Sequence, residues 1–530
     1  MKYLVAISGP VASGKSVLAE ETLKRFKSYR ISTRQLLIDS GAPNERNALI
    51  EAGNRLDEAT DCSWVLEHSR RHIDEHQNCD VVIIDAVRKA KQIHHLREAF
   101  GEKFIHVHVT VPYAVAEERY KARDLKDAPP YKEVRAEPTE NGVWSLDQIA
   151  DRVVKNINCD RPSLLARAVA GLKLFPGEPE RLVDVLVGGQ YGSEGKGNIC
   201  AFLAQDYDVL VRVGGPNAGH MVAYPSQKYV QLPSGTRSNP KAKILIGAGA
   251  TIWPAQILKE IEECGLTKDR LVIDAQAMII EPSDREIEAE LLGGIASTKQ
   301  GVGAATARKI IGRDKPPPFG VPVRLARDHP DLRQFIKSVS SELEDAYTNG
   351  LRVMLEGTQG TDLSLYHGHY PHVTSRETTA AGCLADAGIS PHRVRRIIMV
   401  TRTYPIRVGG QSGPIGIEIT FNTVAERSGL PLHEIEGTEV GTISGNRRRI
   451  AEFDWEQLRR SACLNGATDI ALTFADYITG ENRNARRFDQ LSAETRAFIA
   501  DVEHVANAPV SLISTWFDRY AVIIDRRNWR

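Results

Sequence analysis

The 530-residue chain has few of the features that mark secreted, zinc-binding or membrane proteins. Its cysteines are odd in number, and none forms a CxxC pair, so we expect neither a disulfide framework nor a zinc site, and we expect a reducing, cytoplasmic setting. No apolar stretch approaches the roughly 20 residues that span a bilayer. The N-terminal run MKYLVAISGP is broken by lysine and glycine, unlike the hydrophobic region of a signal peptide.

The chain also lacks a net charge, because 68 basic residues balance 68 acidic ones. This balance gives no reason to expect a nucleic acid or an acidic membrane as a partner. The hydrophobic share of 42% and the charged share of 26% are those of an ordinary globular protein. The length predicts two or three domains.

Buried-strand patterns alternate with amphipathic helical patterns twice along the chain. The apolar runs at 2–8, 79–88 and 103–111 predict a first α/β domain with a parallel sheet flanked by helices. Around 160–180 we expect a short helix and then a Pro/Gly/Glu-rich break. The pattern then restarts and predicts a larger α/β domain with a mostly parallel sheet. We therefore expect a domain at 1–160, a linker at 161–180 and a second domain at 181–530.

A phosphate-binding loop is predicted near the N-terminus. The segment GPVASGKS at 9–16 fits G-x-x-x-x-G-K-[ST], and it lies between a predicted strand and a predicted helix, as the motif requires. Gly9 and Gly14 shape the loop, Lys15 reaches the β and γ oxygens, and Ser16 ligates Mg²⁺.

Other residues of the first domain fit a kinase. Asp85 ends the strand VVIID, where it can hold the Mg²⁺ shell. Arg119 and Arg123 are spaced i, i+4, so they either clamp a transferring phosphate or form a solvated helix face. The order of these motifs over residues 1–130 resembles small nucleoside- and deoxynucleoside-monophosphate kinases. The acceptor is left open.

A second glycine-rich loop, GGQYGSEGKGN at 188–198, is of another kind. A Walker loop would need glycine at 190 and serine or threonine at 197, and the chain has Gln190 and Gly197. One predicted strand later, RVGGPNAGHMV at 212–222 places His220 in a neighbouring loop. Loops at the carboxyl ends of parallel strands lie side by side, and a lysine with a histidine beside a phosphate suits phosphoryl transfer.

These two segments together resemble the N-terminal signature of the adenylosuccinate synthetase family. Later segments agree in order: LPSG (232–235), ASTKQGVG (296–303), LEGTQGTDL (355–363), HGHYPHVTS (367–375), RVGG (407–410), GTISGNRRR (441–449), LTFAD (472–476) and LISTWFDR (512–519). The resemblance covers nearly all of 181–530. It implies an α/β fold with a mostly parallel sheet, and it implies a homodimer.

The resemblance also implies a reaction in two steps. The γ-phosphate of a purine triphosphate moves to O6 of a 6-oxopurine nucleotide, and the amine of L-aspartate then displaces that phosphate. Lys196 would contact the migrating group, His220 would act as an acid toward the leaving diphosphate, and Gln359 would stabilise the O6 oxyanion. Gly219 would bind Mg²⁺ through its carbonyl, with Ser193 at the position of the second ligand.

Binding roles follow from the same resemblance. The phosphate loop would use Gly192, Glu194, Gly195 and Gly197. The acceptor nucleotide would be held by Asn217, Thr298, Thr374, Arg313 and Val408. The aspartate loop would contribute Ser444, Arg447 and Arg448, which agrees with the need of a dicarboxylate for cationic forks. The base of the triphosphate would lie near Phe474, Asp476, Ser514 and Trp516.

The chain departs from the family pattern at informative positions. Ser193 replaces an aspartate that takes a proton from inosinate, and a neutral hydroxyl is a poor base near pH 7. In carrying serine at this position the chain resembles the 2-aminoadenylosuccinate synthetase branch of the family, which uses (d)GMP, aspartate and ATP. Asn446 replaces an arginine that reads the ribose 2′-hydroxyl, which favours a deoxynucleotide.

The site for the base of the triphosphate also differs from the family pattern. Phe474 and Trp516 replace residues that read guanine, so stacking faces stand where base-specific contacts are expected. This favours ATP or dATP as donor, although Asp476 keeps GTP open.

We therefore predict a ligase that makes a 2-amino-N6-succinyl-(deoxy)adenylate with Mg²⁺, fused to a nucleotide kinase. Its partners would be nucleotides and L-aspartate, without nucleic acid or membrane. Two alternatives remain: an ordinary synthetase acting on IMP or dIMP, and a non-catalytic nucleotide sensor.

Overall fold

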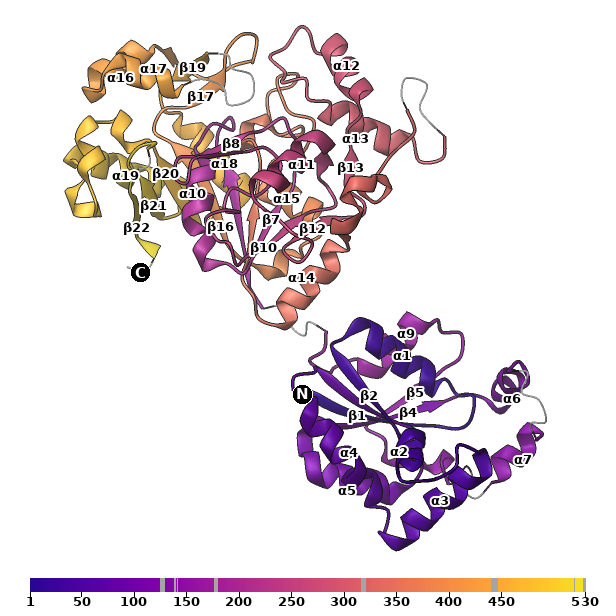
Figure 1. The fold of residues 1–530 in the computed structure, drawn as a ribbon. Coiled ribbons are helices and arrows are strands. Elements are labelled where there is room, and N and C mark those ends of the chain that lie inside the picture. Colours follow the sequence, from indigo (N-terminus) through magenta and orange to yellow (C-terminus); the bar gives the residue numbers. More distant parts are fainter. Residues whose placement is uncertain are drawn as a thin grey trace. The chain divides into compact units, whose positions relative to one another are not determined.

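The computed structural model describes residues 1–123, 129–137, 140, 142–175, 180–315, 321–439, 447–518 and 520–527. The chain divides into two compact units, 1–175 and 176–530 (Figure 1). The first unit extends beyond the boundary at 160 because α9 (Arg161–Val169) packs against α1 (Lys15–Arg25) and buries Leu164 and Leu165. Residues 161–175 are therefore part of the first unit and do not form a linker.

The first unit is built on a five-stranded parallel sheet with the order β2-β3-β1-β4-β5. The strands are β1 (Tyr3–Ser8), β2 (Ser28–Ser32), β3 (Val81–Asp85), β4 (Phe104–Thr110) and β5 (Arg152–Lys155). The other helices of at least six residues are α2 (Thr33–Asp39), α3 (Arg46–Ala59), α4 (Trp64–Glu75), α5 (Ala90–Phe100), α6 (Tyr113–Lys121) and α7 (Tyr131–Ala136).

Side chains of β1 alternate between two hydrophobic cores, as the period of a strand requires. Leu4 and Ala6 enter the core that α2 to α5 cover. Val5 and Ile7 enter the core that α1 and α9 cover. Helices on both faces explain why the strands are continuous apolar runs.

The second unit has a ten-stranded sheet with the order β14-β12-β10-β7-β15-β6-β16-β20-β21-β22, in which only the last pairing is antiparallel. The strands are β6 (Val183–Gly188), β7 (Val209–Arg212), β10 (Lys243–Ile246), β12 (Leu271–Asp274), β14 (Ile336–Lys337), β15 (Val353–Glu356), β16 (Val394–Arg402), β20 (Asp469–Thr473), β21 (Val510–Ser514) and β22 (Ile523–Asp525).

Smaller sheets and helices surround this sheet (Figure 1). The small sheets pair β8 (His220–Val222) with β9 (Gln227–Tyr229), β11 (Thr251–Ile252) with β13 (Met278–Ile279), and β19 (Arg448–Ala451) with β17 (Ile406–Val408) and β18 (Glu418–Ile419). The helices are α10 (Lys196–Leu203), α11 (Pro254–Glu263), α12 (Pro282–Leu291), α13 (Val302–Ile311), α14 (Val339–Thr348), α15 (Ala380–Ala387), α16 (Phe421–Ser428), α17 (Leu432–Thr438), α18 (Trp455–Asn465) and α19 (Ala493–Ala506).

The central strand β6 divides the core of the second unit. Val185 and Val187 face the core shared with α14, α15, α18 and α19, and Leu186 faces the core shared with α10 and α11. The chain runs from β6 to one side of the sheet, returns at β15, and then fills the other side. Such a switch point leaves a crevice at the carboxyl ends of the strands. No described helix has the length and apolar character needed to cross a membrane.

Truncation of a central core side chain should destabilise the second unit. Leu355 on β15 is fully buried, so Leu355→Ala removes apolar contacts and leaves a cavity, at a cost of about 2–5 kcal/mol. Chemical denaturation measures this change in the transition of the second unit. Leu464→Ala, on the exposed side of α18, is the control and should cost less than about 1 kcal/mol. Equal losses in both variants would contradict the assigned core.

Candidate active site

A cleft of 1310 Å³ opens at the carboxyl edge of the ten-stranded sheet, beyond β6, β7 and β15. It gathers residues from segments far apart in the sequence. The predicted site residues that line it are Gly192, Ser193, Gly195, Lys196, Gly197, Asn217, Gly219, His220, Thr298, Gln359, Thr374, Val408, Arg448 and Phe474.

The glycine-rich loop between β6 and α10 has a backbone that suits a phosphate. Gly192 and Gly195 have φ values of 94° and 85°, and Gly195 caps the N-terminus of α10. A Cβ on Gly197 would lie 2.8 Å from the Met221 carbonyl oxygen. The loop thus brings backbone N–H groups and the positive end of a helix to the cleft wall, an arrangement that favours an anion.

Glu194 lies beneath this loop and does not line the cleft. Its Oε1 accepts hydrogen bonds from the backbone N–H groups of Gln190 (3.0 Å) and Gly192 (2.8 Å). Its Oε2 accepts one from Lys196 Nζ at 2.6 Å, and both side chains are 1% exposed. Glu194 therefore shapes the loop and orients Lys196, and it does not present its carboxylate to a phosphate.

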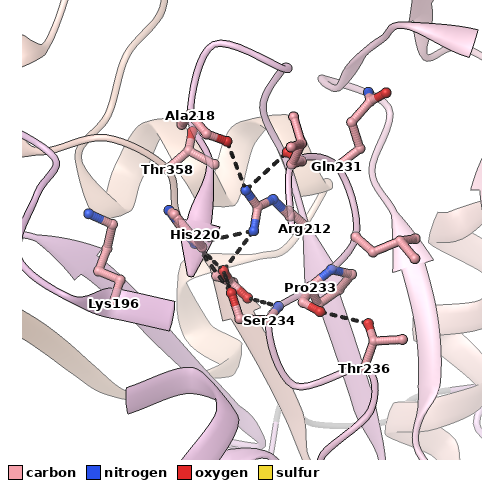
Figure 2. Close-up of polar contacts among 12 residues, drawn as sticks. Lys196, Arg212, Ala218, His220, Gln231, Pro233, Ser234, Thr236 and Thr358 are labelled. Carbon is pink, nitrogen blue, oxygen red and sulfur yellow. Dashed lines mark hydrogen bonds and ion pairs between the residues drawn. The ribbon is translucent and has the colours of Figure 1, made fainter. Parts of the chain in front are cut away.

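His220 is held by a buried carboxylate that the sequence did not single out. Arg212 ends β7 and Glu356 ends β15, and the two residues are partners in the strand register. Figure 2 shows Arg212 close to His220 and Ser234. Glu356 Oε1 accepts from Arg212 Nη1 (2.8 Å), His220 Nδ1 (2.5 Å) and Ser234 Oγ (2.6 Å), and Oε2 accepts from the Ser234 N–H (2.7 Å).

This arrangement fixes the ring of His220. Nδ1 lies 3.2 Å from Arg212 Nη1, which can only donate, and 2.5 Å from Glu356 Oε1, which can only accept. We infer from the shorter contact that Nδ1 carries the proton, and Nε2 is buried without a partner in the described protein. Burial, with the nearby charge of Arg212, lowers the pKa of His220 to about 4. Burial alone would raise the pKa of Glu356, but the Arg212 charge and the bonds from His220 and Ser234 hold it at about 2.

Asn217, Gln359 and Thr374 form a polar cluster in the lining of the cleft. Thr374 Oγ1 accepts from Asn217 Nδ2 (3.1 Å) and from Gln359 Nε2 (2.5 Å). The acceptor atoms Asn217 Oδ1 and Gln359 Oε1 are buried without partners in the described protein. Gln359 also has a φ of 64°, a strained conformation that the surroundings must maintain. Two orphaned acceptors suit a ligand with N–H or O–H donors.

The residues predicted to bind the substrate aspartate do not all lie at the cleft. Arg448 lines the cleft, and its Nη1 donates to Glu439 Oε2 at 2.9 Å. Arg447 is exposed, and its carbonyl accepts from the Gly409 N–H at 3.0 Å. Ser444 and Asn446 lie outside the described residues. Arg313 is exposed beyond the end of α13 and does not line the cleft of this chain.

The predicted donor-base residues separate into two groups. Phe474 lines the cleft together with Phe517, and their ring centroids are 6.5 Å apart with planes 12° from parallel. Asp476 is 2% exposed, is bound by Arg483 Nε at 3.0 Å, and does not line the cleft; its burial raises its pKa to about 6.

Ser514 and Trp516 also lie away from the cleft. Arg483 covers the Trp516 ring at 4.6 Å, and Ser514 Oγ donates to the Trp516 carbonyl at 3.3 Å. Trp516 and Phe517 together replace the family's Gly-Pro, and Phe517, not the expected Trp516, lines the cleft.

The first unit places its own phosphate loop between β1 and α1. Gly9 and Gly14 have φ values of 143° and 103°, and a Cβ on Gly9 would lie 2.2 Å from the Val109 carbonyl oxygen. Lys15 Nζ donates to the carbonyls of Gly9 (2.6 Å) and Pro10 (2.8 Å). Burial lowers the pKa of Lys15 to about 8, although the charge of Glu140 opposes this shift.

Asp85 lies beside that loop, because it pairs with Ile7 in the strand register. Its Oδ2 accepts from Arg30, and its Oδ1 is buried without a partner in the described protein. Ser16 is exposed in the first turn of α1. The helix α6 ends at Lys121, so Arg119 is on the helix and Arg123 lies beyond it.

The part of the chain that the structure describes contains no preformed protein cage for a metal. Among the described residues, no group of three or more His, Cys, Asp or Glu side chains is placed to hold an ion. Ser193, with a hydroxyl, and Gly219, with a backbone carbonyl, line the cleft, and the first loop has Ser16 near the unpartnered Asp85 oxygen. These few oxygen donors fit Mg²⁺, which keeps few protein ligands when substrate phosphates supply the others.

Comparison with known proteins identifies the second unit. The sequence model of adenylosuccinate synthetase matches residues 185–314 and 323–483. The adenylosuccinate synthetase of Pyrococcus sp. (strain ST700) is 38% identical over 354 residues, which are 65% of this chain and 98% of that protein. The chain belongs to the adenylosuccinate synthetase family. Its second unit is accordingly a ligase of the type that joins aspartate to a purine nucleotide.

Other relatives support this assignment. The adenylosuccinate synthetase of Methanocaldococcus jannaschii is 38% identical over 65% of this chain and 96% of its own length. The fold matches the fully ligated adenylosuccinate synthetase of Plasmodium falciparum (TM-score 0.56, 23% identity, 65% of this chain and 100% of that chain). It also matches the succinoaminodeoxyadenylate synthetase of cyanophage S-2L, solved with dGMP and with dATP as energy donor (TM-score 0.52, 27% identity, 64% of this chain and 94% of that chain).

The buried histidine makes the stability of the second unit depend on pH. The pKa of His220 is about 4 in the folded protein and ordinarily about 6.5, so its contribution is complete above pH 6.5 and is lost as the pH falls toward 4. The limit of this loss is about 3 kcal/mol. Glu356, with a pKa of about 2, adds a loss only below about pH 4.5.

Denaturation of the second unit at pH 7 and pH 5 should therefore show a lower free energy of unfolding at pH 5, and His220→Asn should reduce this difference. His433→Asn is the control, because His433 is exposed, and it should keep the difference of the parent. An unchanged difference in His220→Asn would contradict the assigned histidine environment.

Proposed function

We propose that the second unit uses a guanine monophosphate, dGMP or GMP, as the acceptor of L-aspartate and makes 2-amino-N6-succinyl-(deoxy)adenylate. Ser193 is the observation that carries the proposal. It lines the cleft in the phosphate loop, where the family resemblance calls for an aspartate. The relative of cyanophage S-2L, solved with dGMP and dATP, supports the same reading.

The chemistry favours an acceptor that carries a 2-amino group. An aspartate at 193 would place a charged base in the cleft, whereas serine is smaller, neutral and able to accept a hydrogen bond from an exocyclic amine. Lys196, His220 and Gln359 remain in the cleft for the transfer of the γ-phosphoryl group to O6. The aspartate amine then forms the C6–N bond as the C6–O bond breaks and phosphate leaves.

The donor in this proposal is ATP or dATP. The face of Phe474 and the face of Phe517 bind a base by stacking, which is tolerant of base identity. Asp476 is buried and paired with Arg483, so it does not present a carboxylate to the amino groups of guanine in the cleft. Mg²⁺ bound by the triphosphate would meet the Ser193 hydroxyl and the Gly219 carbonyl, and would neutralise charge on the phosphates.

We also propose that the first unit is a nucleotide kinase that phosphorylates a nucleoside monophosphate. Support comes from the loop at 9–16 in its strand-to-helix setting and from Asp85 beside it. Arg88 and Arg123 lie close enough to Lys15 to lower its pKa, so cations gather where a phosphate acceptor would bind. The proposal includes the homodimer that the family resemblance implies.

Two other functions remain as outcomes of the tests. An ordinary synthetase would use IMP or dIMP. A nucleotide sensor would bind at both phosphate loops and release neither phosphate nor ADP.

The acceptor is tested by incubating the protein with aspartate and Mg²⁺, with IMP, dIMP, GMP or dGMP as acceptor, and with ATP, dATP or GTP as donor. We expect the succinyl product with GMP or dGMP, read by mass spectrometry, and better turnover with ATP or dATP than with GTP. Ser193→Asp should shift the preference toward IMP or dIMP by at least tenfold in kcat/KM. Product from IMP or dIMP alone would contradict the proposal, as would an unchanged preference in Ser193→Asp.

One substitution in each phosphate loop distinguishes the activities of the two units. Lys196→Ala should abolish the ligase reaction and leave phosphorylation of monophosphates by ATP intact, because Lys196 belongs to the second unit. Lys15→Ala should do the reverse. Assays of nucleoside diphosphate and of succinyl product in both variants measure this. A parent protein that formed neither product would support a sensor in place of two enzymes.

A further inference from the structure

A second buried carboxylate, Glu439, lies behind the cleft and does not line it. It follows the last residue of α17 and is fully buried. Its Oε1 accepts from Arg402 Nη2 (2.6 Å) and from the Tyr477 hydroxyl (2.8 Å), and its Oε2 accepts from Arg448 Nη1 (2.9 Å). One carboxylate thus holds two guanidinium groups in fixed positions.

The first guanidinium connects Glu439 to the phosphate and base sites. Arg402 is 1% exposed at the end of β16, and its Nη1 donates to the Ser193 carbonyl at 3.1 Å. Its guanidinium also lies 3.9 Å from the centroid of the Phe474 ring. Arg402 therefore contacts both the glycine-rich loop and an aromatic wall of the cleft, although it does not itself line the cleft.

The second guanidinium connects Glu439 to the cleft surface. Arg448 is 13% exposed and lines the cleft, and its Nε is buried without a partner in the described protein. Among the residues that the structure describes, Glu439 is the acidic partner of Arg448, and Arg448 also lines the cleft, where an anion can approach it. Two arginines on one carboxylate leave an excess positive charge, which is costly when buried and favours an anionic ligand.

We propose that Glu439 is a positioning residue that joins the aspartate site to the phosphate and base sites through Arg402 and Arg448. The proposal rests on the role of Arg448 in binding aspartate. Glu439 holds the guanidinium of Arg448 in the orientation that binds a dicarboxylate, and the same carboxylate holds Arg402. Arg402 in turn holds Ser193 and Phe474 in place, so filling one site stabilises the geometry of the other.

The test compares steady-state kinetics of Glu439→Gln with those of the parent protein, using the acceptor and the donor that turn over best. The amide keeps the volume and removes the charge, so Arg448 and Arg402 are both held less firmly. We expect KM to rise at least tenfold for aspartate and at least threefold for the triphosphate, with kcat changed less than threefold. A purely structural role would lower the active fraction, and thereby kcat, with both KM values unchanged.

A more distant variant keeps the proposal testable if Glu439→Gln does not fold. Arg402→Lys retains the positive charge. A lysine has one terminal nitrogen, so it cannot replace the two guanidinium nitrogens that bind Ser193 and Glu439 separately. Its triphosphate KM should rise at least threefold, and its aspartate KM should also change at least twofold, although Arg402 lines no part of the cleft. Non-additive changes in the Arg402→Lys/Arg448→Lys double variant would show the coupling.

Glu418→Gln is the matched control. Glu418 pairs with Arg449, the neighbour of Arg448 on β19, and its side chain is 50% exposed. Both KM values should stay within twofold of the parent. If Glu439→Gln or Arg402→Lys folds and leaves both KM values within the range of this control, the proposal is wrong.

Failure of the proposed acceptor is a separate outcome, because the kinetics are measured with whichever nucleotide reacts. If no nucleotide reacts, calorimetric titration of aspartate into the protein with ATP and dGMP replaces KM. Weaker aspartate binding in Glu439→Gln and Arg402→Lys would then support the proposal, and unchanged binding would overturn it.

Discussion

The active site depends on one buried carboxylate, that of Glu356, at the end of a central strand. A buried charge is costly unless it is paired and hydrogen-bonded, and Glu356 is paired with Arg212 on the neighbouring strand and bonded to Ser234. This satisfied carboxylate then orients His220, with Nδ1 toward the carboxylate and Nε2 unpartnered. The strand pairing, the segment around Ser234 and the histidine are therefore parts of one electrostatic unit.

The two phosphate loops of the chain are organised by different means. In the first unit, Lys15 donates to the carbonyls of its own loop, so an arriving phosphate has only to replace neutral acceptors. In the second unit, Lys196 is paired with Glu194, which also binds two loop N–H groups. Glu194 therefore ties the loop backbone and Lys196 together before substrate binds.

Local features of the site could be predicted from the sequence, and features that need sheet order could not. Both phosphate loops could be predicted from the spacing of their glycines, because positive φ values and close approach of the backbone are local requirements. The pair of Arg212 and Glu356 was missed because the residues are 144 positions apart and meet only when β15 inserts beside β7. Two charged residues at the ends of apolar runs were the available signal.

Other differences have local physical reasons. A short helix is expected in the segment after residue 160, and α9 lies there, with Asp160 as its cap through the Ser163 N–H and a proline in its first turn. Its packing against α1, which places it in the first unit, depends on tertiary contacts. Phe517 lines the cleft in place of Trp516 because Trp516 packs beneath Arg483. Which of two adjacent aromatic residues faces a cleft depends on the path of the chain after β21, and composition does not reveal it.

The central claim is that Glu356 fixes the proton of His220 on Nδ1. It is tested most directly by ¹⁵N NMR of protein labelled at histidine, with His220→Asn used to assign the signal. The account predicts a protonated Nδ1 and an unprotonated Nε2 from pH 8 down to about pH 5, with no titration near the ordinary histidine pKa of about 6.5. A proton on Nε2 at neutral pH, or a titration midpoint near 6.5, would contradict it.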